Sequence, residues 1–165
     1  MQLGLEDGDL DSREVDYINA HGTSTPQGDV AETQAIRLVF GERSARIAVS
    51  STKSMTGHAQ GAAGAIESVY TVLAVERGIL PPTINYERPD HSCELDYVAN
   101  RSRPARIRVA LNNFFGFGDT NATLASRPSA RSRSELKSCI VGGPRDLRRR
   151  LNLPDVTSVV ELRND

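Results

Sequence analysis

The 165-residue sequence contains no tryptophan and few aromatic residues, which make up 5% of the chain. It has no run of about 18 uninterrupted apolar residues, the length that a membrane-spanning helix needs. Basic and acidic residues nearly balance, with a formal net charge of −1, so the composition does not indicate a nucleic-acid-binding surface. With 38% hydrophobic residues, the chain has the composition of an ordinary globular domain. We therefore expect a protein that binds neither a membrane nor a nucleic acid.

Cysteine is also scarce, and the two present are Cys93 and Cys139. No CxxC motif and no framework of paired cysteines occurs, so we expect both thiols to be reduced. The first residues, MQLGLEDGDLDSREVD, are acidic where a targeting signal is basic, and we expect a cytoplasmic location. The three histidines, at positions 21, 58 and 91, show no short metal-ligand spacing. We expect no metal site.

Basic residues are concentrated near the C-terminus. Residues 129–165 hold eight Lys and Arg against five Asp and Glu, whereas residues 1–128 hold 12 against 16. The change falls at ASRPSARSRSELK, where apolar periodicity stops. We predict a domain over residues 1–128 and a basic tail of unknown structure over residues 129–165. The tail is either a separate appendage or linker, or it uses its RDLRRRL stretch as a basic docking helix.

Strand patterns and helix patterns alternate upstream of the tail. Short β-rich runs predict strands at 15–20, 46–52, 94–98, 106–114 and 122–126. Asp29 can cap a helix that Gly41 ends, and a second helix is predicted from about His58 to Arg77, before Gly78 and a Pro-Pro pair. This alternation indicates an α/β domain built in layers.

The second predicted helix, over residues 58–77, is apolar around nearly its whole circumference. A helix of this kind is typically buried on all sides. We therefore expect a mixed β-sheet packed on a buried helix, with further structure on the other side of that helix.

Three loops that follow predicted strands combine polar side chains with glycine: HGTSTPQGD, TKSMTGH and FGFGDTN. In α/β folds, ligands gather at loops beyond the carboxyl ends of strands. His21 and His58 are each either partners of a local turn or catalytic groups, and two imidazoles on adjacent loops favour acid–base chemistry. Lys53 is either a solvated charge or a fixed cation beside them.

A second interpretation of this region is phosphate binding at a helix N-terminus, which the glycine-rich run GHAQGAAG at residues 57–64 would allow. Its spacing fits neither GxxxxGK[ST] nor a GxGxxG that follows a strand. We favour close helix packing as the reason for these small residues.

Four ordered motifs cover about residues 10–127: NAHGTSTPQGD, VSSTKSMTGHAQGAAGAIE, LPPTINYERPD and NNFFGFGDTN. Their order and separations resemble the C-terminal half of a β-ketoacyl-acyl carrier protein synthase, a condensing enzyme of fatty acid or polyketide synthesis. The resemblance implies a layered α/β thiolase-like half-domain. It also implies an acyltransferase activity, the decarboxylative Claisen condensation of a malonyl thioester with an acyl thioester.

The resemblance implies roles for individual residues. His21 and His58 resemble the two active-site histidines that hydrogen-bond the malonyl thioester carbonyl and assist decarboxylation. Lys53 resembles the lysine that supports them. Thr23 and Thr25 match the threonines that contact the phosphopantetheine arm.

A second group of residues matches the family around the last motif. Phe117 resembles the gating phenylalanine, whose N–H joins the oxyanion hole, and Gly116 and Gly118 would let its loop move. Glu67 matches a buried glutamate with a structural role. The sequence departs from the family at Asp119, where glycine is usual, and at Phe114, where serine is common.

The resemblance also implies that the catalytic cysteine is missing. In the family it lies in the N-terminal half, and neither Cys93 nor Cys139 has a comparable setting. The implied partners are acyl carrier protein, whose phosphopantetheine carries the substrates without a further cofactor, and an N-terminal half or homodimer partner. We expect the first strand and helix of the half-domain to be absent and apolar surfaces to be uncovered. The alternative is an inactive remnant or a carrier-protein-binding half-domain.

Overall fold

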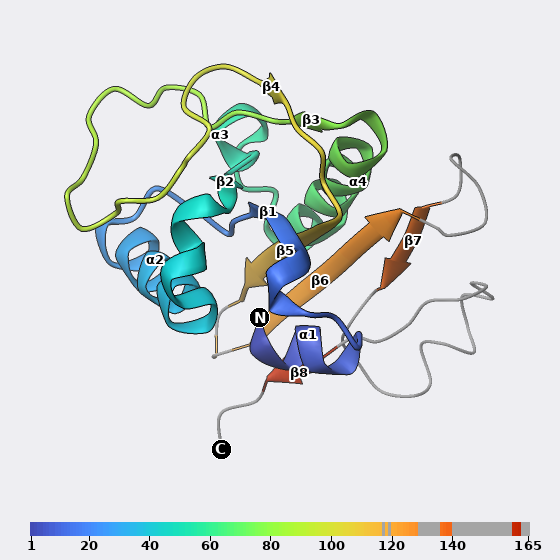
Figure 1. Cartoon of the computed structure of the whole chain (residues 1–165). Helices are drawn as coiled ribbons and strands as arrows, with labels where there is room; N and C mark the ends of the chain where they lie inside the picture. The colour runs from blue at the N-terminus through green and yellow to red at the C-terminus, as the bar shows by residue number, and fades with distance from the viewer. Residues whose placement is uncertain (117, 119, 129–135, 140–159, 163–165) are drawn as a thin grey trace.

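A mixed β-sheet forms the middle of the computed structural model, which describes residues 1–116, 118, 120–128, 136–139 and 160–162 (Figure 1). The strands lie in the order β2 (Ala48–Ser50), β1 (Val15–Asn19), β5 (Val109–Phe115), β6 (Asn121–Pro128) and β7 (Leu136–Cys139), and β8 (Val160–Leu162) also pairs with β6. Strand β1 is parallel to both neighbours, whereas β6 is antiparallel to β5, β7 and β8. A separate antiparallel pair joins β3 (Ile79–Leu80) and β4 (Arg103–Pro104).

Helices cover both faces of the sheet. Helices α1 (Gln2–Asp7) and α2 (Pro26–Phe40) pack on one face, where Leu5 and Ile36 share a core with Leu111. Helix α4 (Ala63–Arg77) packs on the opposite face, where Val75 contacts a core that contains Tyr17. The short helix α3 (Lys53–Thr56) follows β2, and short 3₁₀-helices lie at η1 (Ser12–Glu14), η2 (Gly41–Arg46) and η3 (Gln60–Ala62). The layers thus confirm the α/β class expected from the sequence.

A bulge in β1 decides which of its side chains enter each core. In a regular strand, residues two apart share a face. The register of β1 against β5 shifts between Val15 and Tyr17, so Val15 joins Ile18 in the α2 core while Tyr17 enters the α4 core. All three side chains are completely buried, which makes β1 the centre of both cores.

The predicted strands at 15–20, 46–52, 106–114 and 122–126 correspond to β1, β2, β5 and β6. The strand predicted at residues 94–98 is wrong. Asp96 forms only an isolated bridge with Ala48, and Val98 has a φ of 45°, which lies outside the extended region. The adjacent Tyr97 instead bonds through its hydroxyl to Thr33 of α2, at 2.6 Å. This segment is therefore a loop held between β2 and α2.

Helix α2 begins earlier than its predicted cap. It starts at Pro26 after Thr25, and Asp29 lies within its first turn, where its Oδ1 accepts the Ser24 N–H at 3.2 Å. Gly41 ends the helix, as predicted, with a φ of 55°.

Helix α4 also differs from its prediction, because it begins at Ala63 and only one of its faces is buried. Ile66, Val69 and Tyr70 remain 37%, 59% and 38% exposed. The sheet covers one side of the helix, and among the described residues nothing covers this apolar side. The expectation of uncovered apolar surface is met here.

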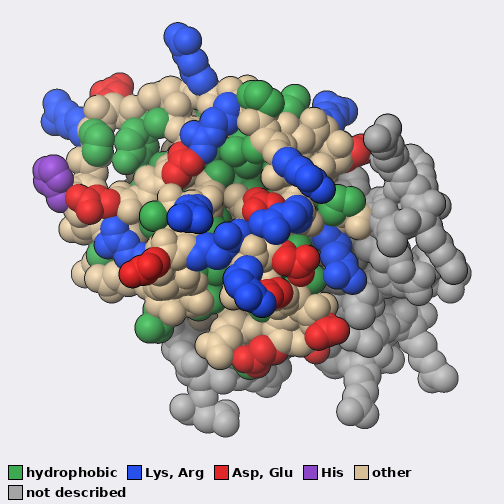
Figure 2. All heavy atoms as spheres, viewed as in Figure 1, with side chains coloured by type: hydrophobic (Ala, Val, Ile, Leu, Met, Phe, Trp, Pro, Cys, Tyr) green, Lys and Arg blue, Asp and Glu red, His purple; other side chains and the backbone are tan. Residues whose placement is uncertain are grey.

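The division into a domain and a basic tail stays a prediction. Within the described residues, no helix is both long enough and apolar enough to cross a membrane. Figure 2 shows one face of the molecule, on whose described part basic and acidic side chains are intermixed.

We expect Leu111→Ala to lower the free energy of unfolding by about 2–5 kcal/mol, because this β5 side chain is fully buried and its truncation leaves a cavity. The matched change Leu38→Ala removes a side chain that is 87% exposed and should change the value by less than about 0.5 kcal/mol. Urea denaturation measures both values. Equal losses in the two variants would contradict the placement of this core.

Candidate active site

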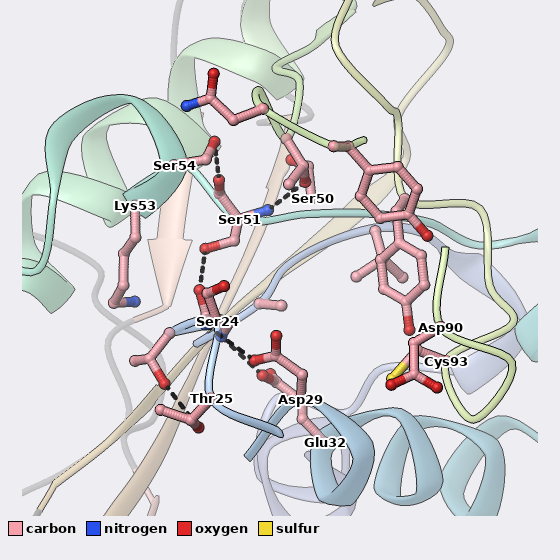
Figure 3. Close-up of a pocket in the computed structure, with 18 of the residues that line it drawn as sticks. Ser24, Thr25, Asp29, Glu32, Ser50, Ser51, Lys53, Ser54, Asp90 and Cys93 are labelled. Carbon is pink, nitrogen blue, oxygen red and sulfur yellow. Dashed lines mark hydrogen bonds between the residues drawn. The ribbon is translucent and has the colours of Figure 1, made fainter. Parts of the chain in front are cut away.

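Two of the predicted functional loops, those that follow β1 and β2, meet at the carboxyl ends of these strands. There they line a pocket of about 880 Å³, shown in Figure 3. Thr23, Thr25, Lys53 and His58 all line this pocket, as does Gly22 next to His21. The structure therefore brings together the histidine, lysine and threonine residues that the sequence placed on separate loops.

The two histidines lie against each other in the same tautomer. Their ring centroids are 5.5 Å apart and their planes are nearly perpendicular, at 86°. Nδ1 of His21 accepts the N–H of Phe115 at 3.2 Å, and Nδ1 of His58 accepts the N–H of Gln60 at 3.1 Å. In a neutral imidazole whose Nδ1 is an acceptor, Nε2 carries the proton. The pair therefore offers two Nε2–H donors to a ligand.

His21 is neutral at pH 7. Burial, the Lys53 charge and His58 together lower its pKa from 6.5 to about 4. Because the unfolded chain binds this proton more readily, His21 makes folding less favourable as the pH falls from about 6.5 towards 4. At neutral pH the ring acts as a hydrogen-bond donor without carrying a charge.

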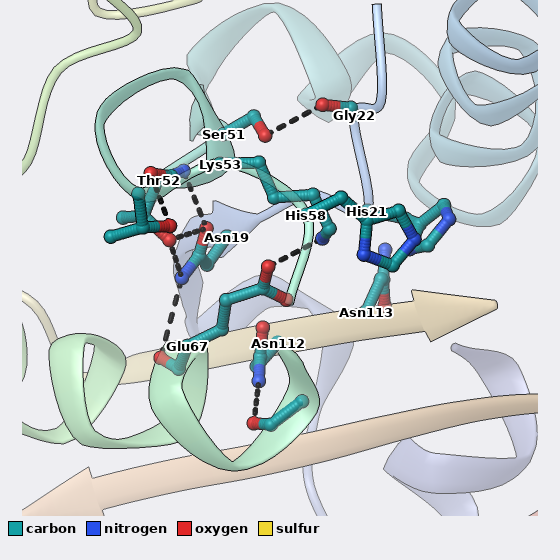
Figure 4. A network of polar contacts seen from close by, with 12 residues as sticks. Asn19, His21, Gly22, Ser51, Thr52, Lys53, His58, Glu67, Asn112 and Asn113 are labelled. Carbon is teal, nitrogen blue, oxygen red and sulfur yellow. Dashed lines mark hydrogen bonds and ion pairs between the residues drawn. The ribbon is translucent and has the colours of Figure 1, made fainter. Parts of the chain in front are cut away.

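Lys53 is a buried cation and not a solvated one. Its Nζ lies 2.5 Å from Oε1 of Glu67, and the two side chains are 4% and 2% exposed (Figure 4). Burial raises the pKa of Glu67, against the hydrogen bond and charge of Lys53, which lower it. Glu67 thus links α4 to α3, in keeping with a structural role.

Asn19, at the end of β1, fixes the backbone around this ion pair. Its Nδ2 donates to Thr52 Oγ1 and Thr71 Oγ1, both at 3.2 Å, and to the carbonyl of Glu67 at 3.3 Å. Its Oδ1 accepts the N–H of Thr52 at 3.3 Å. The sequence analysis missed this residue, although a buried asparagine that ends a β-rich run is a usable signal.

Glu32 is a second residue that the sequence analysis missed. Its carboxylate accepts the N–H groups of His21 at 3.0 Å and Gly22 at 2.9 Å, and Nδ2 of Asn113 at 3.1 Å. Burial raises its pKa, while these donors and the Lys53 charge oppose that shift. Its signal in the sequence is an acidic residue four positions before the buried Ile36, on the same face of α2.

Glycines permit two close approaches at the site. Gly22 has a φ of 35°, and a Cβ on it would lie 2.7 Å from Cβ of Ser51. A Cβ on Gly64 would lie 3.1 Å from the ring of Phe114. This contact supports helix packing as the reason for the Gly-Ala run, and it shows how the larger Phe114 is accommodated.

The threonine pair and the glycines of the last motif are exposed or half-buried. The Oγ1 atoms of Thr23 and Thr25 lie 3.3 Å apart. Gly116 donates its N–H to the Thr120 carbonyl at 2.7 Å, and Gly118 has a φ of 77°. Phe117 and Asp119 lie outside the described residues, so the gating role stays a prediction.

Cys93 is a free, half-buried thiol that lines the same pocket. In Figure 3 it lies beside Asp90, on the side of the pocket opposite Lys53. Within the part of the chain that the structure describes, no three His, Cys, Asp or Glu side chains gather as metal ligands.

Comparisons with known proteins identify relatives of this chain. Residues 1–87 match the family model of the beta-ketoacyl synthase C-terminal domain. The 3-oxoacyl-[acyl-carrier-protein] synthase 2 of Coxiella burnetii is 53% identical over 124 residues, which are 75% of this chain and 30% of the relative. The protein of the same name from Synechocystis is 56% identical over 121 residues, which are 73% of this chain and 29% of the relative.

A solved structure shares the fold. It is described as AntDE:AntF, a type II PKS acyl-carrier protein in complex with its ketosynthase bound to the hexaketide. It superposes with a TM-score of 0.75 at 43% identity, over 76% of this chain and 31% of the other. The chain therefore spans only about 30% of the length of the proteins it matches.

We expect Lys53→Met to lower the free energy of unfolding by about 3–5 kcal/mol, because it leaves the Glu67 carboxylate buried without its cation. Replacing both partners, in Lys53→Met with Glu67→Leu, should restore most of this loss. Arg13→Met, which breaks an exposed ion pair with Asp11, should have little effect. Denaturation of the three variants tests the pair, and a double variant as unstable as Lys53→Met would contradict it.

Proposed function

Because the chain belongs to the beta-ketoacyl synthase family, as its C-terminal domain, we propose that it forms the malonyl side of a 3-oxoacyl-acyl carrier protein synthase. The thiolase-like half-domain fold that the resemblance implied is confirmed by the ketosynthase that superposes on it. The proposed activity is that of an assembly, because the chain matches only about 30% of the length of these relatives.

The arrangement of His21 and His58 is the observation that carries the proposal. When malonyl thioester loses CO₂, the bond between its carboxylate and the α-carbon breaks, and the electron pair is delocalised onto the thioester oxygen. Two fixed N–H donors beside that oxygen stabilise the developing enolate. His21 and His58 supply such a pair, each with its Nδ1 occupied by a backbone N–H. The α-carbon then attacks the acyl thioester on a cysteine, whose thiolate leaves.

Lys53 supports this chemistry through its charge. It adds to burial in lowering the pKa of His21, which keeps that ring neutral, and with Glu67 it holds α3 and α4 beside the histidines. The net effect on a nearby enolate depends on Glu67, which partly cancels the lysine charge. We therefore assign Lys53 a supporting role and not a role in proton transfer.

The substrate-binding roles follow from the pocket and from the family. Thr23 and Thr25 hold hydroxyls on the pocket wall, where they would contact the amides of the phosphopantetheine arm. The substrates would arrive on acyl carrier protein without a separate cofactor, and a relative has been solved in complex with such a carrier. Phe117, with Gly116 and Gly118, would form the gate and part of the oxyanion hole. We propose a cytoplasmic location for this activity.

A second polypeptide part, carrying the nucleophilic cysteine, would complete the site. Ile66, Val69 and Tyr70 form an apolar stripe on α4 that the described part of the chain leaves exposed. The remaining two thirds of the family's length, or a homodimer partner, would cover this stripe.

The alternative is a half-domain that binds carrier protein without turnover. It is favoured by the position of Cys93, which lies on the side of the pocket away from Lys53.

We expect the isolated chain to self-associate or to unfold without cooperativity, because the α4 stripe is uncovered. Sedimentation and thermal melting measure this behaviour. Val69→Lys should reduce self-association, and Leu38→Lys, at an exposed position of α2, should not. A compact monomer with a cooperative transition would contradict the need for a covering partner.

We expect His21→Ala and His58→Ala each to slow CO₂ release from malonyl carrier protein by roughly 100-fold or more, since each removes one donor to the enolate oxygen. The assay uses the chain together with a cysteine-bearing ketosynthase part and also scores 3-ketoacyl product. His91→Ala, at an exposed histidine outside the pocket, is the matched control. Unchanged rates in the first two variants would overturn their roles, and no product in any mixture would favour the half-domain without turnover.

A further inference from the structure

A line of buried polar side chains runs from β6 through β5 to the backbone of His21. Thr123 Oγ1 donates to Asn113 Oδ1 at 2.9 Å, and Asn113 Nδ2 donates to Glu32 Oε1 at 3.1 Å. Glu32 in turn accepts the N–H groups of His21 and Gly22. We propose that Thr123 and Asn113 are positioning residues, which hold His21 through Glu32 in the tautomer that donates from Nε2.

The burial of these groups makes their hydrogen bonds interdependent. Thr123, Asn113 and Glu32 are 5%, 0% and 5% exposed. Water therefore does not readily replace a lost partner, and a buried polar atom without one is unfavourable. Each side chain in the line can hold its position only while its neighbours hold theirs.

Asn113 links the position of Thr123 to that of Glu32, because one of its two polar atoms accepts and the other donates a hydrogen bond. An asparagine amide accepts at Oδ1 and donates at Nδ2. Its Nδ2 must face the Glu32 carboxylate, which can only accept, so its Oδ1 must face Thr123. Removal of the Thr123 hydroxyl leaves Oδ1 buried without a donor, and the amide loses one of the two bonds that hold its Nδ2 in place against Glu32.

Glu32 then has a weaker bond from one of its three N–H donors, all of which favour its ionised form. Burial already raises its pKa, and the bonds from Gly22, Asn113 and His21 oppose that shift. With this bond weakened, the carboxylate binds a proton more readily and is a weaker acceptor for the backbone of residues 21 and 22. The backbone of His21 is consequently held less firmly.

Strand β5 is linked to His21 in two ways, and both links depend on the position of the His21 backbone. Asn113 reaches its backbone through Glu32, and the Phe115 N–H reaches its ring at Nδ1, at 3.2 Å. Figure 4 shows Asn113 directly beside His21. A shift of the His21 backbone lengthens the contact with Phe115, and a freed Nδ1 can take the proton in place of Nε2. The catalytic meaning of this tautomer rests on the proposed function, but the tautomer itself does not.

The experiment uses the full chain with Val69→Lys, which reduces self-association, labelled with ¹⁵N at its three histidines, and His58→Gln and His91→Gln serve for assignment. Long-range nitrogen–proton spectra report which ring nitrogen carries the proton. We expect His21 to be an Nε2–H tautomer in the parent chain and a mixture in Thr123→Val, which keeps the volume and removes the hydroxyl. Thr123→Ser, which retains the hydroxyl, should restore the parent spectrum.

Ser126→Ala is the matched control on the same strand. Ser126 is 1% exposed, and among the described residues its Oγ has no hydrogen-bond partner. This variant removes a buried hydroxyl of β6 without touching the line of side chains, so the His21 tautomer should not change.

Amide hydrogen exchange provides a second readout. The exchange of the His21 and Gly22 N–H groups should be at least about tenfold faster in Thr123→Val, since their acceptor is weakened. Should that variant fail to fold, Thr123→Ala takes its place. Parent-like tautomer and exchange in the variant that lacks the hydroxyl would overturn the proposal, as would the same change in Ser126→Ala or no restoration by Thr123→Ser. An assembly without decarboxylation would refute the proposed function but leave these readouts intact.

Discussion

The site depends on a buried ion pair between α3 and α4, two successive helices that follow β2. Lys53 and Glu67 meet at 2.5 Å in a region where each side chain is almost completely buried. Removing two charges from water is unfavourable by several kcal/mol per ion, so the pair is stable only if its geometry is kept. Asn19 meets this need by bonding to the backbone on both sides of the pair, at Thr52 and Glu67. Because His58 lies in the turn between α3 and α4, the same constraint places the second imidazole.

One cation and one anion act on different parts of His21. Lys53 and burial keep the ring neutral, whereas Glu32 binds the backbone N–H groups of His21 and Gly22. The ring charge and the ring position are therefore controlled by separate groups. This separation lets an uncharged imidazole keep a fixed direction for its Nε2–H, which is what stabilisation of a developing oxyanion requires.

The sequence predicted the strands and the residues on the loops that follow them, because both signals are local. Short β-rich runs located β1, β2, β5 and β6, and the resemblance singled out Lys53 and His58, which line one pocket, and His21, whose ring lies against His58. Asn19 and Glu32 were missed because their partners lie far along the chain, 33 residues away for Thr52 and 81 residues away for Asn113. Residues 94–98 were wrongly predicted as a strand for a related reason, since Tyr97 bonds to α2 in place of a neighbouring strand. Periodicity reports which side chains are buried, and it does not report which buried polar groups meet.

Helix α4 was predicted to be buried on all sides, and in the structure one of its apolar faces is exposed. This exposed face indicates where a partner would pack. The face against the sheet contains Glu67 and Thr71, and the open face contains Ile66, Val69 and Tyr70. A helix at the edge of a finished globular protein normally has the opposite arrangement, with its apolar residues inward. Here the inward polar residues serve the ion pair and Asn19, so polarity on that face follows from the site. The apolar residues on the other face have no such use among the described contacts. Their presence supports a second apolar surface packed there, as the proposed assembly with a cysteine-bearing part requires.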